Sequence, residues 1–201
     1  MPFEAPQDKL YAQKSLPPHA SICSDGDCST CHADDKSELA KGFDGALRGC
    51  EEWILSPESW AQGPEPFITT VGLGSQMGRV SSVAPANLPA REFQRGNQYW
   101  RINSTQSAGY VLVVSDQLPM CHITGGGNAD LQPIVTKTLA SADFSERWQL
   151  VSQSDRGDMQ SSLYRNTNEP SLTMVVSHAK AADGPTDRVQ VIATAHIQMT
   201  H

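Results

Sequence analysis

This sequence lacks a cluster of basic residues and any long apolar run. Lys and Arg number 15 against 22 Asp and Glu, so the formal net charge is -7 at pH 7. A surface that binds a nucleic-acid backbone needs clustered positive charge, and a helix that spans a bilayer needs ~18 consecutive apolar residues. The composition therefore argues against nucleic-acid partners and against a membrane span.

Apolar residues are scarce as well, at 38% of the chain, whereas globular proteins usually contain ~45–50%. The length of 201 residues suits one domain with a tail. A domain of ~150 residues buries enough surface to form a core without cross-links or metals. We therefore expect one globular domain, in which any disulfide or metal site must be argued from particular residues.

A leader sequence is also missing from the chain as given. The N-terminal run MPFEAPQDKL has no basic stretch followed by an apolar segment, so no signal peptide is visible. Five cysteines in a chain of this size nevertheless favour an oxidising compartment. We expect a periplasmic or secreted protein.

The apolar pattern divides the chain into two parts. Residues 1–33 contain four prolines and scattered apolar residues with no regular spacing, so we expect an extended or disordered arm. Residues 34–201 form the expected single domain. It begins with a helix, because apolar residues recur at spacings of 4, 4, 3 and 4 and so share one helical face. These residues are Leu39, Phe43, Leu47, Cys50 and Ile54.

The rest of the domain is predicted to be mainly β. Segment 56–96 is rich in Pro, Gly and Ser and reads as loop, with one strand-like run at 67–71. Short β-type runs separated by turn residues then follow at 98–103, 110–115, 120–124, 147–152, 159–165, 171–178 and 188–197.

A second helix interrupts these strands. Gly125, Gly126 and Gly127 are predicted to break the chain before it. Its apolar face comprises Leu131, Ile134, Val135 and Leu139. The expected fold class is therefore α+β: a mainly antiparallel sheet of about six to seven strands packed against two helices, with an extended N-terminal arm.

Two cysteines of the domain are predicted to form a disulfide. Cys50 lies on the apolar stripe of the first helix, and Cys121 lies in a β run beside Met120 and Ile123, so both thiols should point into one core. The alternative is two buried free thiols, because unpaired cysteine is often buried.

The other three cysteines and a histidine lie within ten residues of the arm. Cys28, Cys31 and His32 match the CxxCH pattern, in which two thiols attach haem c and the histidine ligates the iron. Cys23, Cys28 and Cys31 have the C-x4-C-x2-C spacing of plant-type 2Fe–2S loops. The run at 28–32 resembles the CSTCH of vertebrate-type ferredoxins, and that resemblance implies cluster ligation. Zinc held by Cys23, Cys28, Cys31 and His32 is the third interpretation.

The surroundings of the cluster argue against each cofactor. The arm has little apolar surface to enclose a haem, and it leaves at most 22 residues ahead of Cys23 for the strands that flank a ferredoxin loop. Adjacent Cys31 and His32 strain tetrahedral zinc geometry. We therefore expect no bound cofactor, with one disulfide and one remaining thiol among Cys23, Cys28 and Cys31.

No catalytic arrangement can be singled out from the remaining residues. His122, His178 and His196 are predicted to be solvated side chains on outer faces or ends of strands, and the three consecutive glycines are predicted to be a flexible turn. The sequence therefore favours an exported small binding or interaction domain without enzymatic activity, whose partner is a small ligand or a protein. The alternative is a redox or metal-carrying protein that uses the N-terminal cysteine cluster.

Overall fold

A long helix is the central element of the fold. The computed structural model describes the backbone of residues 28–180 and 189–197, and side chains in these ranges from residue 34 onward. Helix α1 (Cys28–Leu55) carries the predicted apolar stripe, and Phe43 and Leu47 on it are fully buried. Because α1 begins at Cys28, residues 28–33, predicted to be extended, are helical. Cys23 lies outside the described residues.

Eight strands form one antiparallel sheet in the order β1-β2-β3-β4-β8-β7-β6-β5. The strands are β1 (Met77–Val80), β2 (Asn97–Ile102), β3 (Ala108–Ser115), β4 (Met120–Gly127), β5 (Trp148–Arg156), β6 (Met159–Asn166), β7 (Leu172–Ala179) and β8 (Val189–Ile197). Two consecutive runs of four strands thus meet where β4 pairs with β8. The α+β class with an antiparallel sheet is confirmed, although the described chain has eight strands rather than six to seven.

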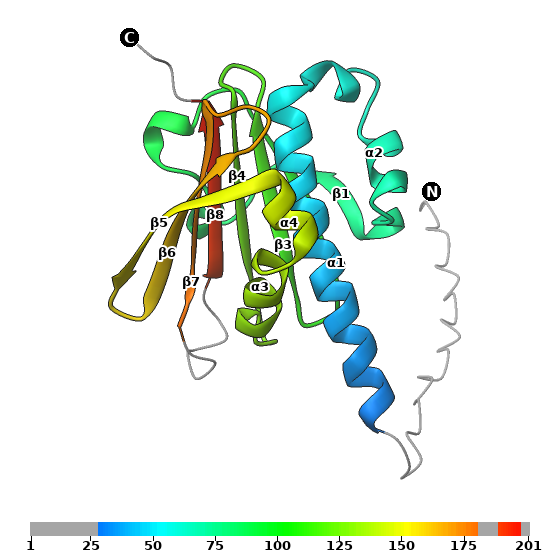
Figure 1. The fold of residues 1–201 in the computed structure, drawn as a ribbon. Coiled ribbons are helices and arrows are strands. Elements are labelled where there is room, and N and C mark those ends of the chain that lie inside the picture. The colour runs from blue at the N-terminus through cyan, green and yellow to red at the C-terminus, as the bar shows by residue number, and fades with distance from the viewer. Residues whose placement is uncertain (1–27, 181–188, 198–201) are drawn as a thin grey trace, which may run out of the picture.

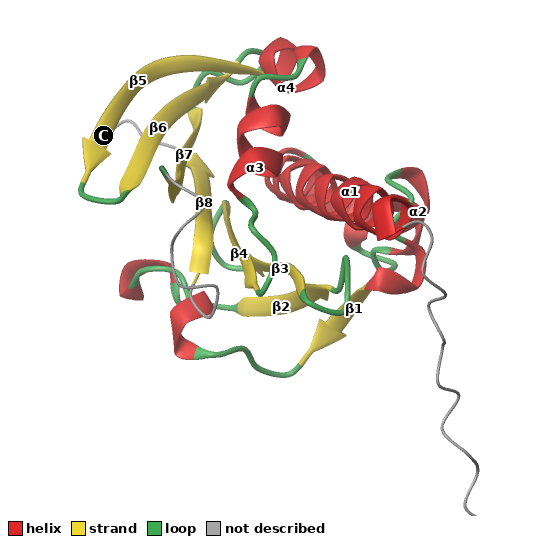
Figure 2. Ribbon diagram, turned by 90° about the horizontal axis from the view of Figure 1, so that it is seen from below, coloured by secondary structure: helices red, strands yellow, loops and turns green. Residues whose placement is uncertain are grey.

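The sheet is curved, and α1 lies in its hollow (Figures 1 and 2). The described chain has four α-helices rather than two, since α2 (Glu65–Thr70) and α4 (Ala142–Arg147) accompany α1 and the predicted second helix, α3 (Gln132–Leu139). Figure 2 shows α3 and α4 beside α1, on the same side of the sheet. We call this side of the sheet the inner face and the opposite side the outer face.

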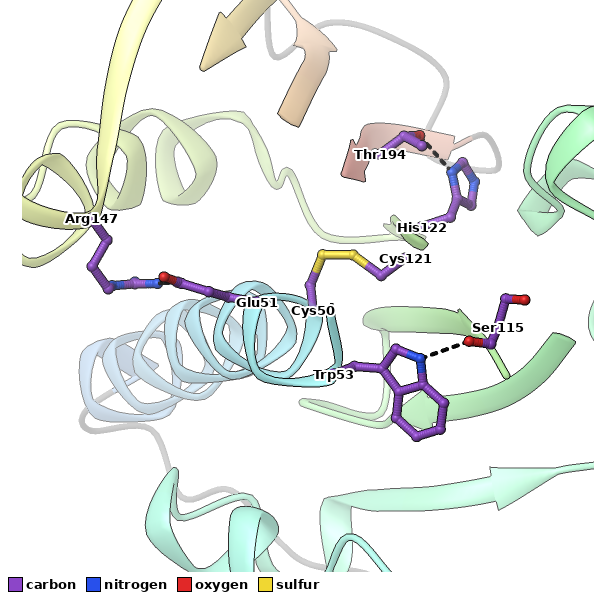
Figure 3. Close-up of a disulfide and its surroundings, with 8 residues drawn as sticks. All are labelled: Cys50, Glu51, Trp53, Ser115, Cys121, His122, Arg147 and Thr194. Atoms are coloured by element: carbon purple, nitrogen blue, oxygen red, sulfur yellow. Dashed lines mark hydrogen bonds and ion pairs between the residues drawn. A yellow bond between two sulfur atoms is a disulfide. The ribbon is translucent and has the colours of Figure 1, made fainter. Parts of the chain in front are cut away.

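The predicted disulfide joins α1 to the middle of the sheet. Cys50 and Cys121 are bonded, with their Cα atoms 5.4 Å apart and both side chains fully buried (Figure 3). Because successive side chains of a strand point to opposite faces, Cys121 and Ile123 face α1, whereas Met120 and His122 lie on the outer face. The bond therefore identifies which face of β4 belongs to the main core.

A polar cluster secures α4 against α1. The Arg147 guanidinium forms an ion pair with Glu51 of α1 and another with Asp143, 3.0 Å from its carboxylate (Figure 3 shows Arg147 and Glu51). Asn166 at the end of β6 donates a hydrogen bond of 2.9 Å to the Glu51 carboxylate. Arg48 of α1 also pairs with Asp143, at 2.6 Å. The start of β5 is thereby held against the helix.

Two local predictions are wrong. The strand-like run at 67–71 belongs largely to helix α2, where Pro66 is in the first turn and its missing N–H costs no hydrogen bond. The three consecutive glycines do not break the chain but complete β4. A Cβ on Gly125 would collide with the ring of Tyr110 and with Val191, so glycine is required there for close packing within the strand.

The outer face of β3 and β4 is covered by a second layer. Segment 81–96, between β1 and β2, contains the short 3-10 helices η3 (Pro85–Asn87) and η4 (Arg91–Phe93). Figure 2 shows this segment on the side of the sheet opposite α1. Val113 and Met120 are fully buried, yet they stand apart from the main core cluster. We call segment 81–96 the outer cover.

Candidate functional site

A groove of about 640 Å³ lies between the outer cover and strands β2 to β4. We call it the outer groove. It is lined by Ala84, Ala86, Asn87, Arg101, Ile102, Asn103, Gly109, Tyr110, Val111, Thr124, Gly126, Gly127 and Val189. Its volume falls in the range of sites for small organic ligands, roughly 300–1,000 Å³.

The floor of the groove is hollow because three of its residues are glycines. Gly109 of β3 lies directly opposite Gly126 of β4 in the ladder, so no side chain projects from either position. A Cβ on Gly109 would collide with the carbonyl oxygen of Ile102, and Gly127 has a φ of 124°, which other residues rarely adopt. Backbone groups of adjacent strands are therefore exposed to a ligand at this end of the sheet.

A buried hydrogen bond holds the cover against the groove floor. Thr124 of β4 is 2% exposed, and its hydroxyl donates to the Asn87 side-chain oxygen at 2.9 Å. The Asn87 amide group, which lines the groove, is thereby held in one orientation. A second contact lies further along β8, where the rings of Phe93 and His196 are 5.5 Å apart.

Arg101 is the single charged residue among the described residues that line the outer groove. Its side chain is exposed, and it takes part in none of the ion pairs among the described residues. The ring of Tyr110 is not part of the groove wall, because it lies on the inner face, 5.5 Å from the ring of Phe43 in α1. Among the described residues, the groove therefore presents one positive charge, that of Arg101, beside an apolar wall that includes Ala84 and Val111.

Two histidines lie on the same outer face, beyond Thr124. His122 is 5% exposed, and its Nδ1 is hydrogen-bonded to Thr194 Oγ1 at 2.8 Å (Figure 3). His122 Nε2 and His196 Nδ1 are both buried, and neither has a hydrogen-bond partner in the part of the chain that the structure describes. Burial lowers the pKa of His122 to about 4 and also lowers the pKa of His196, so both rings are neutral at pH 7.

The predicted environments of two histidines are wrong. His122 has the outward strand phase that the sequence predicts, but the outer cover buries it instead of leaving it solvated. His178 lies at the inner face, opposite Val191, and is only 6% exposed. Its Nδ1 lies 3.0 Å from the backbone oxygen of Ala179. His178 is therefore a buried and locally hydrogen-bonded residue.

The structure leaves the N-terminal cysteine cluster untested. Cys28, Cys31 and His32 are in the first residues of α1, but their side chains lie outside the described residues, as does Cys23 entirely. Their role as ligands stays a prediction. In the part of the chain with described side chains, no three residues among His, Cys, Asp and Glu are grouped to hold a metal ion.

The outer groove could not be predicted from the sequence. Its cover lies in the Pro-, Gly- and Ser-rich segment, which has no hydrophobic period that would indicate burial.

No helix among the described residues is long and apolar enough to cross a bilayer. Comparisons with known protein families, with curated proteins and with solved structures find no match for this chain.

Proposed function

We propose that this protein is an exported, non-enzymatic binding domain that holds a small anionic molecule with an apolar body in the outer groove. One observation carries the proposal: the guanidinium of Arg101, which forms no ion pair with a described residue, borders a groove whose wall is largely alanine, valine and glycine backbone. A carboxylate or phosphate would bind the guanidinium through charge-assisted hydrogen bonds. The apolar part of the ligand would cover Ala84, Ala86 and Val111.

The lining favours binding over catalysis. A hydrolase or transferase site needs a nucleophile or a general base whose pKa lies near the working pH. The Thr124 hydroxyl donates a hydrogen bond to Asn87, and no described residue of the lining is a histidine, cysteine, aspartate, glutamate or lysine. The groove therefore offers a cation, amide groups and apolar surface, which recognise a ligand without transferring a proton.

A pair of probes tests the ligand class. Octanoate and octanol share an alkyl chain, but only octanoate carries a negative charge. We expect calorimetric titration to show binding of octanoate and much weaker binding of octanol. Arg101→Gln should weaken octanoate binding roughly tenfold, the equivalent of one charge-assisted hydrogen bond. Arg165→Gln, which removes another exposed arginine of the sheet, is the matched control and should leave binding unchanged.

Two outcomes would contradict the ligand proposal. Equal affinity for octanoate and octanol would show that Arg101 does not recognise the negative charge. Equal losses of octanoate affinity in the Arg101 and Arg165 variants would show that the effect of charge is not specific to the groove. Failure of both probes to bind at millimolar concentration would reject an alkyl carboxylate as the ligand class.

Export is supported by the bonded cysteine pair between α1 and β4. Disulfides persist in oxidising compartments and are rare in the cytosol. The test is alkylation of thiols, carried out in denaturant after an acid quench, in protein isolated from its native cells. We expect Cys50 and Cys121 to resist alkylation until a reductant is added, and labelling of both residues beforehand would contradict export.

A redox or metal-carrying role of the N-terminal cluster is the second candidate function. Because α1 begins at Cys28, the backbone places positions 28, 31 and 32 at the i, i+3 and i+4 spacing that shares one side of a helix. A visible spectrum and metal analysis of purified protein separate the two candidates. A colourless, metal-free protein supports the binding domain, whereas a haem band or one equivalent of zinc or iron supports the alternative.

A further inference from the structure

Two buried imidazole nitrogens that have no hydrogen-bond partner among the described residues lie on the outer face of neighbouring strands. His122 belongs to β4 and His196 to β8, and His122 lies opposite Thr194 in the ladder, two residues before His196. A buried nitrogen without a hydrogen bond costs free energy, so two of them on one face require an explanation. A shared ligand between the rings would supply one.

The strand register adds a third donor on the same face. Met120 lies directly opposite His196 in the β4–β8 ladder and two residues before His122, so all three share the outer face. Side chains directly opposite each other have Cβ atoms about 5 Å apart, and diagonal neighbours about 7 Å. Met120 is fully buried and stands outside the main core cluster. A thioether and two imidazoles are thus grouped beneath the outer cover.

We propose that Met120, His122 and His196 bind one copper(I) ion. Thioether sulfur is a soft ligand that selects copper(I), and imidazole is a common copper ligand. The cross-strand neighbours of the three residues on this face, Val113, Thr194 and Thr173, carry no charge. The thioether therefore favours copper(I) over zinc(II), whose protein ligands are thiolate, imidazole and carboxylate groups.

The hydrogen bond to Thr194 prepares His122 for this role. When Nδ1 carries the ring proton and donates it to Thr194 Oγ1, the lone pair of Nε2 is available to a metal. Metal-binding histidines commonly have their second nitrogen held in this way. His196 is only half-buried and lies against Phe93 of the outer cover, so copper would reach the site by displacement of that ring.

The first test is a copper(I) titration that excludes the N-terminal thiols. Cys23→Ser, Cys28→Ser and Cys31→Ser are combined in the full chain, and copper(I) kept reduced with ascorbate is offered in competition with bicinchoninate. We expect one copper per chain. Met120→Leu, which keeps the volume and removes the sulfur, should weaken binding at least tenfold. Met174→Leu replaces another fully buried methionine of the sheet and should have no effect.

A second measurement does not depend on the folding of a Met120 variant. In the thiol-free chain labelled with nitrogen-15, copper(I) should shift the His122 Nε2 and His196 Nδ1 resonances, whereas the His178 resonances should not move. The proposal is overturned if the thiol-free chain binds no copper, or if Met120→Leu and Met174→Leu bind it equally. It is also overturned if zinc(II) binds this site more tightly than copper(I).

Discussion

The two faces of β4 carry different chemistry although they share one strand. On the inner face, Cys121 and Ile123 are fully buried against α1. On the outer face, His122 and Thr124 are 5% and 2% exposed, yet they are polar and are buried by a segment with little regular structure. Apolar packing on the inner face therefore stabilises the fold. The outer face contains buried polar groups that the packing of a hydrophobic core does not require.

This difference supports the outer face as the place of the proposed binding site. A buried apolar face needs only hydrophobic residues of the right size and shape. Burying a threonine and a histidine requires hydrogen bonds for their polar atoms, and the half-buried Asn87 of the outer cover supplies one for Thr124. The cost of burying these polar groups, next to a groove whose Arg101 pairs with no described residue, supports the proposed binding role.

The largest expected loss of stability comes from removal of a buried side chain of the inner core. Phe43 is fully buried, and its ring lies 5.5 Å from that of Tyr110. Phe43→Ala should lower the free energy of unfolding by about 3–5 kcal/mol, measured by urea denaturation. Lys36→Ala changes an exposed residue of the same helix and should stay within about 0.5 kcal/mol of wild type. An unchanged midpoint for Phe43→Ala would disprove the packing described for the inner face.

Removal of the disulfide should be the next largest effect. The double variant Cys50→Ala/Cys121→Ala opens a loop with a sequence separation of 71 residues, which should cost about 2–4 kcal/mol. The matched control is Cys28→Ala/Cys31→Ala, which leaves the core intact. Thermal unfolding of the two proteins without reductant distinguishes them. Equal melting temperatures would show that the bond does not stabilise the fold.

The outer face should give the domain a pH-dependent stability. The pKa of His122 is lowered from 6.5 to about 4 by burial, so the unfolded chain takes up a proton that the folded chain does not. The contribution of the neutral His122 ring to stability is complete above pH 6.5. It should be lost between pH 6.5 and 4, which lowers the free energy of unfolding by roughly 3 kcal/mol in total. In metal-free protein, His122→Gln should remove most of this dependence. Parallel stability curves for the two proteins over this pH range would contradict the burial of His122.

The smallest expected effect concerns the bond between the cover and β4. Thr124→Val keeps the shape of the side chain but leaves the Asn87 oxygen without its donor, at a cost of about 1 kcal/mol. Thr136→Val, on the exposed side of α3, is the control. Hydrogen exchange should become faster in segment 81–96 of the Thr124 variant alone. Unchanged exchange in that segment would show that the bond does not hold the cover.

The inner face could be predicted from the sequence because its residues follow regular periods. The stripe from Leu39 to Ile54 has helical spacing, and the alternation of β8 identifies Val191, Ala193 and Ala195 as core residues, which are all fully buried. The Cys50–Cys121 pair follows from these two patterns. Elements that pack against a continuous apolar layer have apolar residues at regular helical or strand spacing. This spacing can be recognised in the sequence alone.

The outer face could not be predicted in the same way. The sequence predicts that His122 points outward from its strand. Its burial depends on the outer cover, which is separated from β4 by more than one strand of the sequence and has no hydrophobic periodicity. Strand β1 is only four residues long, too short for an alternating pattern to be recognised. The run at 67–71 has β-branched residues that favour a strand, yet Pro66 and the packing of Phe67 beneath α1 select a helix.

The most direct test of binding at the outer groove is an amide shift map of metal-free protein titrated with octanoate. We expect the largest nitrogen-15 and proton shift changes at Arg101, Asn103 and Gly126, with saturation at a common ligand concentration. Amides of Phe43 and Leu47 in α1 should not move. Changes concentrated on α1 or spread evenly over the sheet, or no changes at millimolar octanoate, would contradict binding at the outer groove.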